Sequence, residues 1–124
     1  MPILDTSFLI RLQSDDPAAK ALLKELEGEP LIVPPWVVVE FLTGQPGDPR
    51  SGLDDLSRAF LLSQTSTEWA LDATELRRQL HRRGAQIRLP DFWIAAFARL
   101  FGTFVVTQNV KHFRAMGVPV RSWA

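Results

Sequence analysis

Apolar residues along the chain fall into short blocks, some continuous and some repeating at helical spacing. Four brief continuous blocks are bounded by turn residues or by a polar side chain, a pattern typical of short buried strands. We predict strands, the last of them at a sheet edge, over Pro2–Asp5, Leu31–Val33, Thr103–Thr107 and Val118–Val120.

Longer segments with helical periodicity separate these runs. The clearest is Thr67–Arg83, whose apolar residues recur at spacings of four, three and four, with Thr67 placed to cap the start and Gly84 the end. Asp91–Phe101 is apolar nearly all round and stops at Gly102, which predicts a buried central helix. We also predict three shorter helices: Ser7–Leu12, a helix that starts at Asp15-Asp16-Pro17 and ends at Gly28, and Asn109–Ala115.

The middle of the chain is ambiguous. The β-branched run inside Trp36–Thr43 favours a strand, but the prolines before it and Gly44 after it suit the two ends of a helix, and we predict a helix. Two prolines and two glycines predict an exposed loop over Gln45–Gly52, followed by a helix near Leu53–Leu62. Strands that alternate with helices predict an α/β sandwich around a small, mainly parallel sheet.

Length and composition narrow the class of protein. The 124 residues are expected to form a single domain over 1–124, and the 46% hydrophobic content is that of an ordinary globular chain. No apolar stretch approaches the ~18 residues of a membrane span, and no basic segment precedes an apolar one at the start, so we expect a cytoplasmic protein without a membrane partner. The chain has no cysteine, and His81 and His112 lack zinc-type spacing, which argues against a zinc site.

Charge is divided unevenly along the chain although its net value is zero. Residues 1–76 hold 13 Asp and Glu against 5 Lys and Arg, whereas residues 77–124 hold 9 Lys and Arg against a single acid, Asp91. Such a division suggests a surface for a polyanion, unless folding intermixes the two halves. The helix predicted over Thr67–Arg83 carries a basic stripe, which consists of Arg77, Arg78, Arg82 and Arg83, with His81, and Arg88 beyond the helix. This stripe could bind a phosphate backbone, or it could be a solvated face whose arginines favour the C-terminal end of the helix.

Four polar residues stand where folding alone would not place them. Asp5 ends the first strand, Glu40 interrupts an apolar helix, and Asp91 opens the most apolar one. Asn109 follows the strand that ends at Thr107. Asp5 could simply begin a turn with Thr6 and Ser7 beside it, and Asp91 and Asn109 could be simple helix caps. If the first and third predicted strands are neighbours, these side chains share one cleft. Clustered carboxylates repel one another, and a hard divalent cation such as Mg²⁺ or Mn²⁺ would relieve the repulsion. Such a site can neutralise a scissile phosphate and activate water.

The ordered set of short motifs resembles the PIN-domain ribonucleases, and among them the VapC-type toxins of toxin–antitoxin pairs. The motifs span about residues 2–121: ILDTS at the start, VEF at 39–41, RRG at 82–84, LPDFWIAA at 89–96 and VVTQNVKHF at 105–113. The resemblance implies a PIN-like three-layer α/β/α sandwich and a Mg²⁺- or Mn²⁺-dependent endoribonuclease. It matches the family's acidic ligands to Asp5, Glu40 and Asp91, and it implies a homodimer and a small DNA-binding antitoxin that blocks the cleft.

The chain departs from the family pattern at two positions. Asn109 stands at the fourth acidic position of many relatives, and His112 where an acid is common. Since an amide adds no charge, a weaker second ion or single-ion catalysis is conceivable. Ser7 and Thr107 look like groups that orient carboxylates or water. Two alternatives remain open: a degenerate domain that binds RNA or protein without cutting, and a metal-dependent phosphatase with a closed pocket.

Overall fold

The computed structural model describes residues 1–64 and 66–123. These residues form one parallel sheet of five short strands in the order β3-β2-β1-β4-β5. The strands are β1 (Ile3–Leu4), β2 (Ile32–Val33), β3 (Leu61–Leu62), β4 (Val105–Val106) and β5 (Val120–Arg121). The helices are α1 (Thr6–Gln13), α2 (Pro17–Glu25), α3 (Pro35–Thr43), α4 (Pro49–Ala59), α5 (Thr67–Arg82), α6 (Leu89–Phe101) and α7 (Val110–Ala115).

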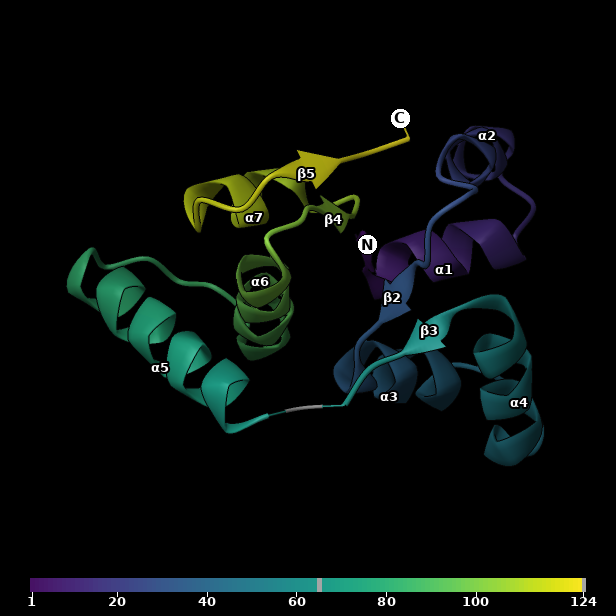
Figure 1. Cartoon of the computed structure of the whole chain (residues 1–124), viewed down its shortest axis with the longest axis horizontal. Helices are drawn as coiled ribbons and strands as arrows, with labels where there is room; N and C mark the ends of the chain where they lie inside the picture. The colour runs from purple at the N-terminus through teal and green to yellow at the C-terminus, as the bar shows by residue number, and fades with distance from the viewer. Residues whose placement is uncertain (65, 124) are drawn as a thin grey trace.

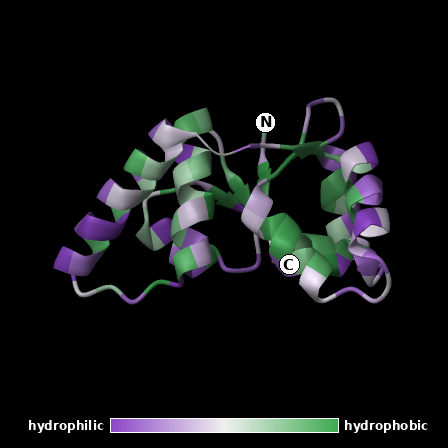
Figure 2. Cartoon of the chain, turned by 90° about the horizontal axis from the view of Figure 1, so that it is seen from below, coloured by the Kyte–Doolittle hydropathy of each residue, from purple (hydrophilic) through white to green (hydrophobic). Residues whose placement is uncertain are grey.

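Helices cover both faces of the sheet, as the predicted α/β/α sandwich requires. Helix α6 packs against the central strands β1 and β4, and α5 lies outside it (Figure 1). Helices α1 and α2 lie on the opposite side of the sheet (Figure 1). The strands are hydrophobic while the outer helix α5 mixes hydrophilic and hydrophobic residues (Figure 2), so the apolar centre is enclosed by amphipathic helices.

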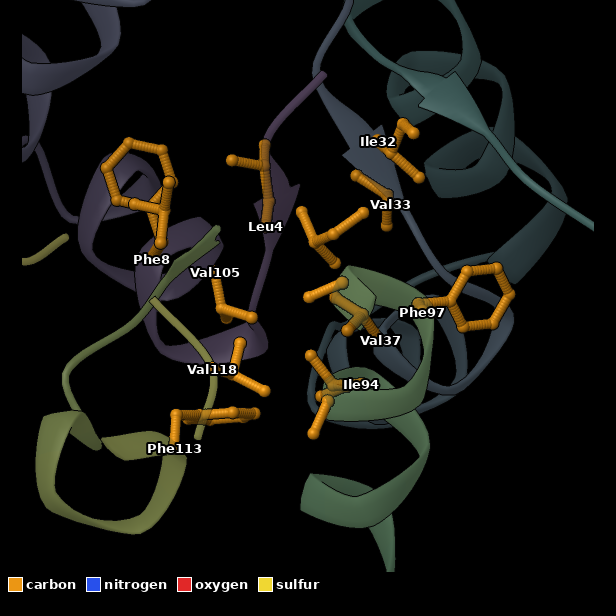
Figure 3. Packing of buried hydrophobic residues seen from close by; sticks show 14 of the residues in the cluster. Leu4, Phe8, Ile32, Val33, Val37, Ile94, Phe97, Val105, Phe113 and Val118 are labelled. Atoms are coloured by element: carbon orange, nitrogen blue, oxygen red, sulfur yellow. The ribbon is translucent and has the colours of Figure 1, made fainter. Parts of the chain in front are cut away.

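The core is built on the two faces of the central strands. Figure 3 shows Phe8 on one side of the strands and Ile94 and Phe97 on the other, and all three side chains are buried. Helix α6 is apolar nearly all round because it lies between the sheet and α5. It ends where the sequence predicts, at Gly102, whose φ of 62° is the left-handed conformation that glycine adopts without strain.

Tryptophans join the helices on the α6 side. Trp36 of α3 stacks on Trp69 of α5, with ring centroids 4.3 Å apart. The indole N–H of Trp69 donates to the backbone carbonyl of Trp93 in α6 at 2.9 Å. These contacts fix α5 relative to α6, which matters because the space between these two helices adjoins the candidate site.

Most predicted elements are confirmed, including the helical assignment of the valine-rich Trp36–Thr43 segment, which lies in α3. The Gln45–Gly52 loop was predicted too long: α4 starts at Pro49, because Asp48 caps it and proline suits a first helical turn. The helix predicted near Leu53–Leu62 ends at Ala59, and Leu61–Leu62 form β3 instead, since they pair with β2.

Smaller boundary errors have similar causes. Ser66, not Thr67, caps α5 by accepting the Trp69 N–H. Helix α6 begins at Leu89, so Asp91 lies in its first turn and is not the cap. The last strand is shifted from Val118–Val120 to Val120–Arg121, and the helix expected to end at Gly28 ends at Glu25. In the described part of the chain, no helix is long and apolar enough to cross a bilayer.

Candidate functional site

Two adjacent strands of the sheet end in the residues that begin the candidate site. The register pairs Leu4 with Val106, so Asp5 and Thr107 follow side by side at the carboxyl ends of β1 and β4. The Thr107 hydroxyl donates to Asp5 Oδ2 at 2.6 Å, and both residues are buried. The expectation that the first and third predicted strands are neighbours is therefore confirmed, and Asp5 is held from the adjacent strand.

Asp5 also serves the local fold. It is the N-cap of α1, where its Oδ1 accepts the Thr6 N–H at 2.8 Å, and the Ser7 hydroxyl lies 3.4 Å from Oδ2. Ser7 Oγ in turn accepts the N–H of Gln108 at 3.1 Å, and Thr107 Oγ1 accepts the N–H of Asn109 at 2.9 Å. The segment after β4 is thus tied to the start of α1 by the two hydroxyls that the sequence singled out.

The electrostatic setting of Asp5 is unfavourable for a bare carboxylate. Burial raises the pKa of the Asp5 carboxyl, the hydrogen bonds from Thr107 and Thr6 lower it, and the nearby charges of Asp91 and Glu40 raise it again, with the net effect upward. Within residues 1–64 and 66–123, no Lys or Arg pairs with Asp5. Asp91 and Glu40 therefore both lie within electrostatic reach of Asp5, and Asp5 lacks a Lys or Arg partner in these ranges.

Asp91 enters the same region from the first turn of α6. Its side chain is only 3% exposed, and its Oδ2 lies 3.3 Å from Nδ1 of His112 on α7. His112 itself is half exposed, so it covers one oxygen of Asp91 from the solvent side. Asn109 occupies the N-cap position of α7, as the alternative of a simple cap predicts, but its side chain makes no capping hydrogen bond to that helix.

Glu40 occupies the exposed margin of the site. Its carboxylate, at the surface of α3, lies 3.5 Å from the guanidinium of Arg88, the residue just before α6. Across the described ranges, no three His, Cys, Asp or Glu side chains are arranged to hold one metal ion together. Asp91 and Glu40 are close enough to Asp5 to affect its pKa, but the three acids do not form such a cluster, and Glu40 is engaged by Arg88.

The chemistry of these donors suits a hard divalent cation. Mg²⁺ is commonly held by one or two carboxylates, with water and substrate phosphate oxygens completing its shell. Asp5 and Asp91 are two buried carboxylates, one of them with a pKa raised by burial and by like charges, which is the condition that a cation relieves. The donor set therefore fits Mg²⁺ or Mn²⁺ without a third protein ligand.

The basic residues divide into two groups. Arg77 and Arg88, with His81, line a pocket of about 600 Å³ between the C-terminal end of α5 and the start of α6. Arg82 instead pairs with Glu75 at 3.6 Å, while Arg78 and Arg83 are exposed. The basic stripe predicted from the sequence is real, but only part of it faces the pocket beside Glu40.

Two features of the region were missed in the sequence. The Arg88–Glu40 pair joins residues 48 positions apart, and neither periodicity nor motif spacing indicates it. A groove of about 510 Å³ lies between α1, α3 and α4, with Leu12, Phe41 and Phe60 among its walls. The sequence contains one sign of this groove: α3 is apolar on more than one face. A helix that buries a single face needs fewer apolar residues.

Comparison with known proteins agrees with this architecture. The chain matches VapBC2 from Rickettsia felis, bound to a DNA fragment from its promoter, with a TM-score of 0.84, 21% identity and 98% of each chain covered. DNA-bound VapBC from Salmonella typhimurium gives 0.83, 20% and 100% of both chains. A toxin–antitoxin complex from Klebsiella pneumoniae gives 0.72 and 25%, over 100% of this chain and 98% of the other.

The structural likeness confirms the predicted fold. No curated protein is significantly similar to the chain in sequence. The PIN domain model, however, matches residues 3–118, nearly the whole chain, and this stretch includes Asp5, Glu40, Asp91 and Asn109. With this match and the sheet that carries Asp5 beside Thr107, the chain belongs to the PIN domain family.

Proposed function

We propose that this PIN domain is a metal-dependent endoribonuclease of the cytoplasm that hydrolyses RNA phosphodiester bonds, and that it is the toxin of a type II toxin–antitoxin pair. The observation that carries the proposal is the buried Asp5 carboxylate, close to Asp91 and Glu40 and without a basic partner among the described residues. Burying such charges is costly unless a ligand compensates them. A divalent cation compensates the negative charge of these carboxylates and can bind a substrate phosphate at the same time.

In this proposal Asp5 and Asp91 hold Mg²⁺ or Mn²⁺. When bound, the cation supplies charge neutralisation at the scissile phosphate and acidifies a water molecule. Thr107 and Ser7 orient Asp5 through their hydroxyls, and His112 orients Asp91 through Nδ1. Glu40 orients water or serves as a further ligand, and Asn109 offers an amide oxygen to the ion or the substrate.

The partners follow from the same setting. The basic surface of Arg77, Arg78, Arg82, Arg83 and Arg88 suits a phosphate backbone. The structural neighbours from Rickettsia felis and Salmonella typhimurium are VapBC bound to DNA, and the Klebsiella pneumoniae neighbour is a toxin–antitoxin complex. By analogy we propose that this chain is a homodimer. We also propose that it binds a small DNA-binding antitoxin that covers Asp5, Glu40 and Asp91, which we call the acidic centre.

The test is cleavage of a long unstructured RNA with and without Mn²⁺. We expect Asp5→Asn and Asp91→Asn each to lower the metal-stimulated rate at least ~100-fold, because metal stabilisation of the transition state is worth several kcal/mol and 1.36 kcal/mol is tenfold. Asp54→Asn, an exposed change on α4, should cleave normally. Wild-type rates in the Asp5 and Asp91 variants would reject the mechanism.

A second candidate has its own observation. Asn109 and His112 stand where the family resemblance leads us to expect acids, and no three acidic or histidine side chains converge in the described residues, which favours a domain that binds RNA or protein without cutting. Calorimetric titration with Mn²⁺ separates the two candidates, since the binding module predicts no heat at millimolar metal. The phosphatase alternative predicts a closed pocket, whereas the pocket between α5 and α6 is bordered by the exposed side chains of Arg77, His81 and Arg88.

A further inference from the structure

The pocket between α5 and α6 has two chemically different walls. Arg77, His81 and Arg88 supply its polar side, and Ile87 and Leu89 are among the residues of its apolar side. All three polar side chains are exposed. In the described part of the chain, Arg77 makes no ion pair, so its charge is available to a ligand. A pocket with this lining fits an anion attached to a weakly polar group.

Arg88 connects this pocket with the acidic centre. Its guanidinium lines the pocket and also lies 3.5 Å from Glu40 Oε2. Glu40 is in turn close enough to Asp5 to raise the pKa of that carboxyl. The Arg88 side chain therefore borders both the pocket and Glu40, which links the pocket to the neighbourhood of Asp5.

We propose that the α5–α6 pocket is a phosphate subsite for the RNA nucleotide next to the scissile bond, and that Arg88 exchanges Glu40 for this phosphate when RNA binds. The inference rests on the proposed function in one respect: it takes the bound RNA strand to be the substrate. Arg77 and His81 bind the phosphate from the α5 side, and the apolar wall contacts the sugar or base.

Exchange is favoured by the weakness of the present pair. The Arg88 and Glu40 side chains are 58% and 33% exposed, and an ion pair in such a setting stabilises little. A phosphate offers a guanidinium two parallel hydrogen bonds, which are stronger and more specific than one contact at 3.5 Å. When Arg88 turns to the phosphate, the Glu40 carboxylate near Asp5 is released from its ion pair. Glu40 therefore becomes available to the site only when an RNA strand is bound.

The experiment measures binding without catalysis. A fluorescein-labelled ten-nucleotide oligouridylate is titrated in EDTA, with fluorescence anisotropy as the signal. We expect Arg77→Ala and Arg88→Ala each to weaken binding about tenfold and to reduce the slope of log affinity against log salt by about 0.7. Arg58→Ala, an exposed change on α4 outside the pocket, should alter neither value. Unchanged affinity in both pocket variants would overturn the proposal.

A double-mutant cycle tests the exchange itself. Glu40→Gln should tighten binding of the oligonucleotide, because it removes the competitor for Arg88, and should have no effect in an Arg88→Ala background. Glu75→Gln is the matched control because it frees Arg82, which does not line the pocket, and its effect on binding should be the same in the wild-type and Arg88→Ala backgrounds. Equal tightening by Glu40→Gln in both backgrounds would show a general field effect and reject the exchange.

The outcomes also separate this inference from the proposed nuclease. Arginine-dependent binding by a chain that does not cleave RNA with Mn²⁺ would keep the subsite and reject the nuclease. Normal cleavage with binding that is indifferent to Arg77 and Arg88 would keep the nuclease and reject the subsite. If an acidic decapeptide displaced the RNA at equal concentration, the pocket would be assigned to a protein ligand and the proposal overturned.

Discussion

At the scale of single residues, Asp5 combines two tasks. Its Oδ1 starts α1 by accepting the Thr6 N–H, while its Oδ2 accepts the hydroxyl of Thr107 from the neighbouring strand. Burial and the charges of Asp91 and Glu40 oppose its ionisation and raise its pKa. The residue that we place at the centre of catalysis therefore lowers the stability of the metal-free protein when it is charged.

This conflict gives a pH-dependent prediction. Because the pKa of Asp5 is raised on folding, the stability that it contributes is full below the pKa of the unfolded chain and is lost as pH rises through the folded value. We expect Asp5→Asn to raise the Tm in EDTA at about pH 7 by ~3–5 °C, equivalent to about 1 kcal/mol. The gain should vanish toward about pH 3, below the ordinary pKa of aspartate.

Differential scanning calorimetry across pH provides the measurement. Asn keeps the Oδ1 acceptor for Thr6 and can donate to Thr107, so the cap survives the change. Asp54→Asn removes an exposed charge and should leave the pH profile as in the wild type. A Tm for Asp5→Asn below the wild-type value at every pH would contradict this account.

The sequence predicted which residues to examine better than it predicted their partners. Asp5 and Asp91 were singled out because carboxylates stand at the edges of apolar elements, and the structure buries both. The family resemblance also drew attention to Thr107 and His112, which contact them. The Arg88–Glu40 pair was missed because it depends on where two long side chains point after α3 and α6 have packed, which no local pattern encodes.

At the scale of elements, helix ends were predicted best where a single residue determines them. Gly102 ends α6 with a φ of 62°, as its position after the apolar run indicated. Elements that depend on distant partners were predicted worst. Leu61–Leu62 became a strand because β2 offered an edge to pair with, and propensity over two residues cannot reveal such an edge.

A glycine pair tests the helix-end argument. A Cβ at Gly102 meets nothing within 4 Å, so Gly102→Ala should cost about 1 kcal/mol through the left-handed backbone alone. Gly44 also ends a helix, α3, but with a φ of −85° and ordinary contacts of 3.7 Å or more, so Gly44→Ala should be neutral or stabilising by up to about 1 kcal/mol. Urea unfolding measures both, and equal effects would refute the conformational explanation.

At the scale of the whole molecule, the charge division along the chain is only partly kept in space. Ion pairs join the acidic half to the basic half, among them Arg121–Glu25 at 2.7 Å and Arg88–Glu40 at 3.5 Å. Arg77, Arg78 and Arg83 stay outside such pairs in the described ranges. Folding thus neutralises part of the basic segment and leaves a smaller basic area near α5.

Salt should therefore affect RNA binding far more than folding. Exposed ion pairs contribute about 0–1 kcal/mol each, so we expect Tm to change by only a few degrees between about 0.05 and 0.5 M NaCl. Log affinity for the oligouridylate should fall linearly with log salt. The slope should be about −1.4 if Arg77 and Arg88 alone bind phosphates, and about −3.5 if Arg78, Arg82 and Arg83 bind phosphates as well. A flat binding curve would exclude an electrostatic RNA surface.

The order of the strands has a consequence for protein synthesis. β1 is flanked by β2 and by β4, and Thr107, which donates to Asp5, follows β4, about 100 residues later in the sequence. Long-range parallel pairing of this kind must wait until the distant strand is available. A ribosome-bound chain that has not yet exposed residues 105–107 lacks the hydroxyl that supports Asp5, so the setting of this carboxylate is completed only after β4 has emerged.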